Sequence, residues 1–326
     1  MRPFAYERAT DAAGAVAALE RGGDGARYLG GGTNLVDLMK LGVETPQRLV
    51  DVSRLDLGAI ELLDGGGLRI GAGVRMSELA ADRVVRERWP VLAQALLGGA
   101  SGQLRNLATI GGNLLQRTRC PYFQDVSAPC NKRVPGSGCS AREGVHANLA
   151  ILGASEHCIA TNPSDMAVAL VALDALVHVH GTDGPRTIEL AQLHRLPGDE
   201  PQRETNLRPA DLITAVELPA LALAAHSAWR KVRERASFSF AVVSVAAALD
   251  VADGTIRDCR LALGGVAHRP WRALAAESAL RGGPATTAAF AVAAEAELEA
   301  ARPLRDNAYK VGLARDVMIR TLEGLA

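Results

Sequence analysis

The sequence predicts an α+β protein in which a large α/β domain precedes a smaller α+β domain built around an antiparallel sheet. Helical and strand patterns alternate through the first two thirds of the chain. Later, two β-type runs at 242–251 and 257–265 flank Asp253-Gly254, the signature of a hairpin. The proline- and glycine-rich segment 117–160 interrupts the first domain with little apolar periodicity. We therefore predict a two-lobed domain at 1–224 with an insertion at 117–160, and a second domain at 225–326.

The elements of the first domain follow from local signals in chain order. An alanine-rich stretch from Asp11 to Glu20 predicts a helix capped by Thr10 or Asp11. Trp89-Pro90 interrupts the helical pattern of 84–97. The other expected elements are strands at 27–29, 48–52, 68–74, 175–180 and 212–218, and helices at 34–41, 76–81 and 164–173. A glycine turn at 64–67 separates the second and third of these strands, and helices from about residues 271, 286 and 307 finish the chain.

Composition excludes several classes of function. The 36 basic and 36 acidic side chains balance, and aromatic residues make up 4%, so nothing indicates nucleic acid or an anionic membrane surface. No apolar run approaches the length of a membrane span, and the N-terminal residues lack an apolar signal core. We expect a cytoplasmic protein, or a periplasmic one only if a signal-bearing partner carries it there. Five cysteines, four of them crowded together, do not suit a disulfide scaffold.

Two glycine loops predict a site for a diphosphate. The first is Leu29-Gly30-Gly31-Gly32-Thr33-Asn34-Leu35, and the second is Thr109-Ile110-Gly111-Gly112-Asn113. Glycines let the backbone approach an anion closely, with peptide N–H groups free to point at it. The first loop also partly matches a dinucleotide fingerprint with Asp51 at a strand end, but Leu35 stands where the third glycine belongs. Plain tight turns are the alternative for both loops.

Four cysteines follow the second loop within 39 residues: Cys120, Cys130, Cys139 and Cys158. They stand among Pro, Gly, Asn and Lys, where a thiol has no packing role, whereas Cys259 lies in an apolar strand and is assigned to the core. A metal centre would also explain how a long irregular segment stays ordered. Without a Cys-x-x-Cys pair the spacing leaves open zinc, with His146 or His157 as further ligands, a [4Fe–4S] cluster, or unligated thiols.

Two charged residues have both an ordinary and a functional interpretation. Asp165 follows Pro163-Ser164 and is favoured at a helix N-terminus by the helix dipole, yet it would also suit a hydrogen bond to a ligand hydroxyl. Lys231 stands in the cation-rich run from Arg230 to Arg235 and by itself indicates only a solvated charge.

The chain resembles the FAD-binding subunit of the molybdenum hydroxylases, the xanthine dehydrogenase family, over essentially its whole length. Three stretches carry the resemblance: the first glycine loop, the run from Gln103 to Asn113, and Ser164-Asp165-Met166. In most of the family the last two lie closer together, and the excess here is the cysteine segment. The insertion is similar to that of 4-hydroxybenzoyl-CoA reductase and, more so, of bacterial periplasmic aldehyde oxidoreductase, both of which house an additional [4Fe–4S] cluster there. The phrases at 120–123, 129–133 and 135–139 resemble the latter.

The resemblance implies a fold of the molybdopterin dehydrogenase flavoprotein type, with FAD between the two glycine loops. By this likeness, residues 29–35 together with Thr109, Gly111, Gly112 and Asn113 would hold the diphosphate. Ala100 would lie along the flavin, Asp165 would meet a ribityl hydroxyl, and Lys231 would approach the isoalloxazine. The four clustered cysteines would ligate the [4Fe–4S] cluster.

The implied function is electron transfer in a heterotrimeric aldehyde oxidoreductase. A large subunit would oxidise substrate at a molybdenum cofactor, a small subunit would carry [2Fe–2S] clusters, and this chain would pass the electrons through FAD to an external acceptor. No catalytic acid or base is expected in this chain. The alternatives are a stand-alone FAD oxidoreductase with its own substrate pocket, and a zinc-stabilised nucleotide-binding scaffold subunit.

Overall fold

The computed structural model describes residues 1–326, and its first lobe is a small parallel sheet. Strands β1 (Ala5–Arg8), β3 (Arg48–Asp51) and β2 (Ala26–Leu29) lie in the order β1-β3-β2. Helix α1 (Ala12–Gly22) connects β1 to β2. The Asp11 carboxylate caps it by accepting the Gly14 N–H at 2.7 Å, as expected. The first glycine loop leads from β2 into helix α2 (Leu35–Lys40).

The second lobe is a five-stranded antiparallel sheet with helices packed against it. The strand order is β4-β5-β8-β6-β7. Apolar side chains of the sheet and of helices α3, α5, α7 and α10 form the largest core. The strands are β4 (Ile60–Leu62), β5 (Leu68–Gly71), β6 (Leu176–Gly181), β7 (Gly184–Glu189) and β8 (Leu212–Leu218). The helices are α3 (Met76–Ala81), α4 (Arg83–Arg88), α5 (Pro90–Gly98), α6 (Gly102–Arg105), α7 (Ile110–Leu114), α10 (Asp165–Ala172) and α11 (Leu190–Leu193).

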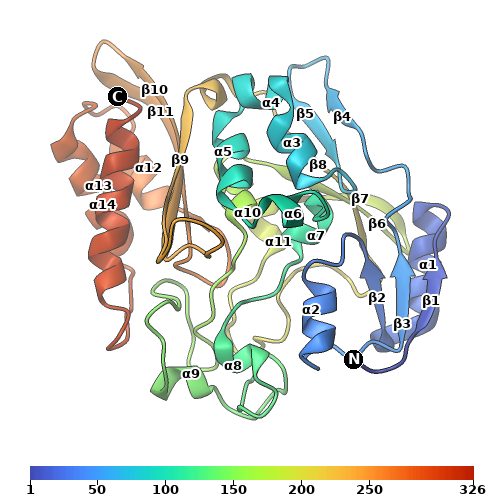
Figure 1. Ribbon diagram of the computed structural model, residues 1–326. Helices are drawn as coiled ribbons and strands as arrows, with labels where there is room; N and C mark the ends of the chain where they lie inside the picture. The colour runs from blue at the N-terminus through green and yellow to red at the C-terminus, as the bar shows by residue number, and fades with distance from the viewer.

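The C-terminal part packs a third sheet between two layers of helices. Its order is β12-β11-β10-β9, all antiparallel. In Figure 1 the C-terminal helices lie on one side of this sheet and α5 and α10 on the other. The strands are β9 (Ser227–Val232), β10 (Val243–Ala252), β11 (Thr255–Gly264) and β12 (Trp271–Arg272), and the helices are α12 (Leu274–Leu280), α13 (Thr287–Leu298) and α14 (Tyr309–Glu323). The boundary after residue 224 stays a prediction, because the helical turn η2 (Ala222–Ala225) spans it.

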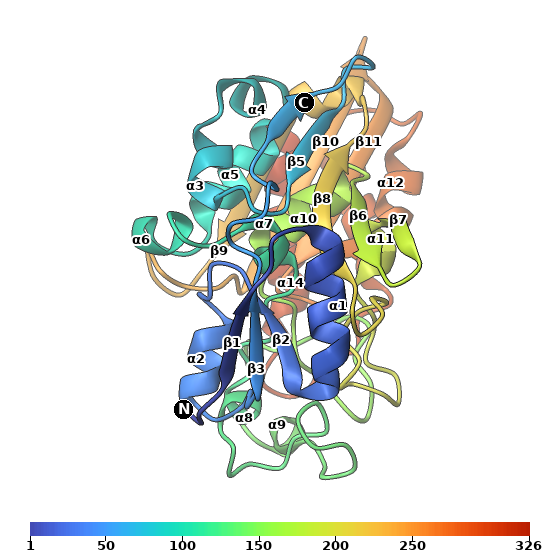
Figure 2. The ribbon, with the colours of Figure 1, turned by 90° about the vertical axis from the view of Figure 1, so that its right-hand side faces the viewer.

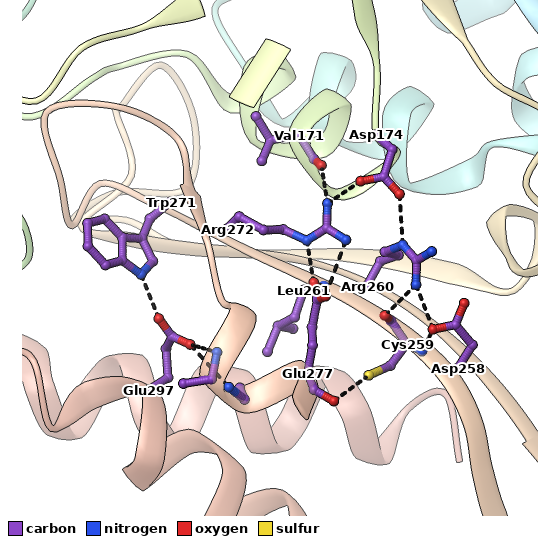
Figure 3. Close-up of polar contacts among 12 residues, drawn as sticks. Val171, Asp174, Asp258, Cys259, Arg260, Leu261, Trp271, Arg272, Glu277 and Glu297 are labelled. Carbon is purple, nitrogen blue, oxygen red and sulfur yellow. Dashed lines mark hydrogen bonds and ion pairs between the residues drawn. The ribbon is translucent and has the colours of Figure 1, made fainter. Parts of the chain in front are cut away.

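Ion pairs to Asp174, which is partly exposed, attach the third sheet to the second lobe (Figure 3). Arg260 Nε donates to Asp174 Oδ2 at 2.8 Å, and Arg272 donates to Asp174 and to the Val171 carbonyl. Glu277 is fully buried and accepts from Arg272 and from the Leu261 N–H. A buried carboxylate needs such partners, and those of Glu277 lie within the C-terminal part. The contacts to Asp174 and Val171 join that part to the second lobe.

The insertion is an ordered lobe at one end of the molecule (Figures 1 and 2). It carries two short helices, α8 (Pro121–Gln124) and α9 (Ser140–Glu143), and an antiparallel bridge between Cys130 and Cys139. Lys310 from α14 is completely buried and donates to the Leu149 carbonyl at 2.9 Å, which ties the end of the insertion to the C-terminal part. Across the whole chain, no helix combines the length and apolar character that a membrane crossing requires.

The predicted fold class and most predicted helices are confirmed, whereas five strands, β1, β4, β7, β9 and β12, were not predicted from the sequence. β1, β4 and β7 are short edge strands without a fully buried face, and β9 was seen only as a cation-rich run. The turn at 64–67 connects β4 to β5, not β3 to β5. The helix expected from residue 271 begins at Leu274, after the short strand β12.

Candidate FAD cleft and cysteine pocket

A cleft of about 880 Å³ lies between the two lobes, and both glycine loops line it. The loops touch each other directly. A Cβ on Gly31 would lie 2.1 Å from the Leu107 carbonyl oxygen, and one on Gly30 would lie 3.1 Å from Thr109 Oγ1. No larger residue fits at position 31 unless the loops separate. The glycines therefore permit the two backbone segments to approach each other closely.

The two loops differ in how many of their backbone N–H groups are free, and the expectation that both hold a diphosphate stays a prediction. None of the N–H groups of residues 30–34 donates to a protein acceptor. In the second loop, Gly111 N–H donates to the Ala72 carbonyl at 2.9 Å, and the Gly112 and Asn113 N–H groups donate to Thr109. The first loop therefore offers more free donors to an anion than the second, in which Thr109 alone has an N–H without a protein acceptor.

The charges along the cleft favour an anionic ligand. Six cationic and four anionic side chains line it. The cationic ones are Arg27, Arg117, Lys132, Arg133, Arg203 and Arg208, and the anionic ones are Asp24, Glu44, Glu204 and Asp211. This excess of positive charge, together with the free amides of the first loop, suits a diphosphate.

The predicted cofactor-binding residues fall into two groups. Gly30 to Leu35, Thr109, Gly111 and Gly112 line the cleft. Leu29 and Asn113 do not line it: Leu29 ends β2, and the Asn113 Oδ1 accepts from Ser164 Oγ at 2.5 Å. Ala100, Asp165 and Lys231 lie outside this cavity as well. The structure does not test the roles predicted for these residues, so they stay predictions.

Of the residues outside the cleft, Asp165 and Lys231 are paired with each other, although no local sequence pattern links them. Asp165 begins α10 and Lys231 belongs to β9. Lys231 Nζ donates to Asp165 Oδ2 at 2.7 Å and to the Gly98 carbonyl at 3.1 Å. Burial raises the pKa of the Asp165 carboxyl, and the Lys231 ammonium opposes that rise. Ala100 follows two residues after Gly98, is exposed, and has a φ of 52°, a strained backbone for a residue with a Cβ.

All four clustered cysteines line one small pocket in the insertion. Cys120, Cys130 and Cys158 are buried, Cys139 is half-buried, and none forms a disulfide. The pocket has a volume of about 10 Å³, room for about one water-sized group. Burial raises the pKa of the Cys120 thiol and raises that of Cys158 to about 12. The predicted convergence of the four cysteines is thus present, while Cys259 packs in the C-terminal core, as expected.

No three His, Cys, Asp or Glu side chains are arranged to hold a single metal ion. His146, which the sequence left open as a further zinc ligand, has other partners in the structure. Its Nδ1 lies 2.8 Å from the Gly144 carbonyl and its Nε2 accepts the Asp306 N–H, so both ring nitrogens are used. His157 lines the cysteine pocket, and its Nε2 lies 3.4 Å from Asp199 Oδ1.

A third, polar cavity of about 30 Å³ lies beside the other two, and sequence reasoning missed it. We call it the histidine chamber, after the buried residues His194 and His268 on its wall. His194 Nδ1 and His268 Nε2 have no hydrogen-bond partner, whereas the other nitrogen of each ring contacts a backbone carbonyl. Lys132 and Glu204 also line it. No local pattern announces these residues, since their burial depends on contacts between distant segments.

Burial in the chamber makes stability depend on pH. It lowers the pKa of His268 to about 4, from about 6.5 in an unfolded chain. Because the folded pKa is depressed, the unfolded state takes up the proton first, and stability is lost as pH falls below 6.5. At pH 5 we expect a loss of about 2 kcal/mol relative to pH 7.5 from this group.

The matched variant is His268→Asn, whose amide can keep the donor to the Arg195 carbonyl but cannot titrate. Urea unfolding at pH 7.5 and pH 5 should show a smaller loss of stability in the variant than in the wild type. Equal losses in the two proteins would contradict the assignment.

Comparison with known proteins identifies both parts of the chain. Residues 2–221 match the family described as FAD binding domain in molybdopterin dehydrogenase, and residues 227–325 match the CO dehydrogenase flavoprotein C-terminal domain. The chain is 51% identical to the aldehyde oxidoreductase FAD-binding subunit PaoB of Escherichia coli (strain K12), covering 99% of this chain and 98% of that protein. It is 27% identical to the glyceraldehyde dehydrogenase medium chain of Sulfolobus acidocaldarius, over 84% of this chain and 79% of the other. A solved carbon monoxide dehydrogenase from Hydrogenophaga pseudoflava, which lacks the Mo-pyranopterin moiety of its cofactor, superposes with a TM-score of 0.77 at 26% identity, covering 99% of this chain and 97% of that one.

Proposed function

The chain belongs to the FAD-binding medium subunits of the molybdenum hydroxylase family of oxidoreductases, and from this membership we propose that it is the electron-transfer subunit of an aldehyde oxidoreductase. In this proposal a large partner subunit oxidises an aldehyde at its molybdenum cofactor. Electrons pass through [2Fe–2S] clusters on a small partner subunit to this chain, which carries FAD and a [4Fe–4S] cluster and delivers them to an external acceptor.

The observation that carries the proposal is the position of the cysteine pocket beside the cleft. The cysteine pocket and the cleft meet at the buried side chain of Lys132, which lines both. Four free thiols at one pocket are the donor set that a [4Fe–4S] cluster requires. A cluster spreads its ligands more widely than one ion does, which is compatible with the lack of a compact three-ligand group.

The residues of the cleft fit FAD on two grounds. Gly31 packs closely against the Leu107 carbonyl, a contact that a Cβ would prevent. The free N–H groups of residues 30–34 can donate to the diphosphate oxygens. When bound, FAD accepts electrons singly from iron–sulfur centres and releases two together. Asp165 can accept from a ribityl hydroxyl through Oδ1, because Lys231 donates to Oδ2.

The chain needs no acid or base of its own in this role, because the aldehyde is oxidised on the partner subunit. Its residues bind and insulate cofactors. A stand-alone oxidoreductase would instead need a substrate pocket with a base, and the zinc scaffold would need zinc on the four cysteines without flavin. The location of the complex, cytoplasmic or periplasmic through a signal-bearing partner, remains part of the proposal.

The test is an anaerobic absorption spectrum of the full chain with flavin, iron, zinc and acid-labile sulfide counted per polypeptide. We expect flavin bands above a broad iron–sulfur absorption, with about four iron and four sulfide per FAD. Cys158→Ala should lose most of the iron while keeping FAD, since the flavin cleft does not include Cys158.

Cys259→Ala is the matched control, because this thiol is also fully buried but packs far from the pocket, in the C-terminal core. It should retain iron. Flavin without iron would overturn the cluster assignment, and zinc without flavin would favour the scaffold alternative.

A further inference from the structure

Lys132 lies where the cysteine pocket, the histidine chamber and the cleft meet. It lines all three and is 3% exposed. Its Nζ donates to Glu204 Oε1 at 2.8 Å and to the Pro201 carbonyl at 2.9 Å. Burying an ammonium is costly even when it is paired, so a packing role alone would be served equally well by a neutral side chain.

Lys132 is the end of a chain of ion pairs that runs along the cleft wall. Arg117 Nε donates to Glu204 Oε2 at 2.7 Å, and the Arg117 Nη1 donates to Glu44 Oε1 at 2.5 Å. Arg27 Nε closes the chain with Glu44 Oε2 at 3.2 Å. Three cations thus share two carboxylates, and the chain keeps one surplus positive charge.

The cysteine pocket faces the positive end of this chain. Lys132 lines this pocket together with all four cysteines, Cys158 among them. Arg117 also stacks on the ring of Phe123, with its guanidinium carbon 4.5 Å from the ring centroid, and Phe123 lines the cysteine pocket. The buried Lys132 therefore lines the pocket directly, and the partly buried Arg117 lies next to it through Phe123 and also lines the cleft.

We propose that Lys132 is a positioning residue for electron transfer, a fixed positive charge between the two cofactor sites that raises the reduction potential at the cysteine pocket. The inference rests on the proposed function, since it assumes a [4Fe–4S] cluster on the four cysteines. Each electron that arrives adds one negative charge and breaks no bond, so a nearby buried cation stabilises the reduced state. Glu204 sets the size of the effect by neutralising part of that charge.

The experiment is an EPR-monitored redox titration of the full chain, after iron, sulfide and FAD have been counted. Lys132→Met should lower the midpoint potential by ~59 mV, which corresponds to a tenfold change in the reduction equilibrium of a one-electron couple. Glu204→Gln should shift it upward, because Lys132 and Arg117 then lose their shared counter-ion. Lys132→Arg should stay near the wild type, and Lys40→Met, the same change at an exposed lysine, should have no effect.

The outcomes separate this inference from the function on which it rests. A wild-type chain without iron and sulfide overturns the cluster assignment and the inference with it. A loaded chain whose potential is the same in Lys132→Met and in the wild type overturns the inference alone. If Lys132→Met does not fold or does not take up the cluster, the midpoint potential of Glu204→Gln becomes the test. An upward shift relative to the wild type supports the proposal, and a downward shift or no shift overturns it.

Discussion

Replacing Gly31 by alanine is expected to weaken FAD binding by roughly a hundredfold, ~3 kcal/mol. The new Cβ would lie 2.1 Å from the Leu107 carbonyl oxygen and 3.2 Å from the Ala108 Cα, both backbone atoms that cannot rotate away. The first loop must then move off the second, which displaces the free N–H groups of residues 30–34. Titration of flavin-free protein with FAD, followed by flavin fluorescence, measures the loss.

Gly102→Ala is the matched control for this change. An added Cβ at Gly102 meets no atom within 4 Å, and the residue begins the short helix α6, where alanine is favourable. It should bind FAD like the wild type. If Gly31→Ala also retained the wild-type affinity, the cleft between the two loops would not be the FAD site.

Replacing Lys231 by methionine is expected to destabilise the protein by about 3–5 kcal/mol. The side chains of Lys231 and Asp165 are 5% and 8% exposed, so the variant leaves a buried carboxylate without its cation. Because β9 and α10 belong to different parts of the chain, the loss should also loosen their contact. Denaturant unfolding followed by circular dichroism measures the change.

A double-mutant cycle identifies the source of this loss. Lys231→Met combined with Asp165→Asn removes both charges and should be less destabilised than the sum of the single variants. Arg83→Met is the control, because Arg83 and Glu87 form an exposed pair that contributes at most ~0.5 kcal/mol. Additive single effects at Lys231 and Asp165 would mean that the pair does not stabilise the fold.

Much of the candidate site was predictable from sequence because its chemistry is carried by residue type. Glycines at positions 30–32 indicate a close approach to the backbone whatever the surrounding fold. Four cysteines among polar residues indicate a pocket outside the hydrophobic core. The capping residue Asp11 likewise predicted a helix start, and it accepts a backbone N–H three residues on. Edge strands such as β1 and β7 lack a fully buried face and left no comparable signal.

By itself, the sequence determined which atoms are present to bind a cofactor: the loop glycines, the four thiols and the carboxylate of Asp165. Only the tertiary structure decided which of them remain free. Gly111 looks like Gly31 in sequence, yet its N–H is used by the Ala72 carbonyl, a partner 39 positions earlier in the chain. Lys132 and Glu204 look like ordinary surface charges, yet folding buries Lys132 where the cysteine pocket meets the cleft and pairs it with the half-buried Glu204. Hydrogen bonding and burial depend on distant segments meeting, and no local pattern records that.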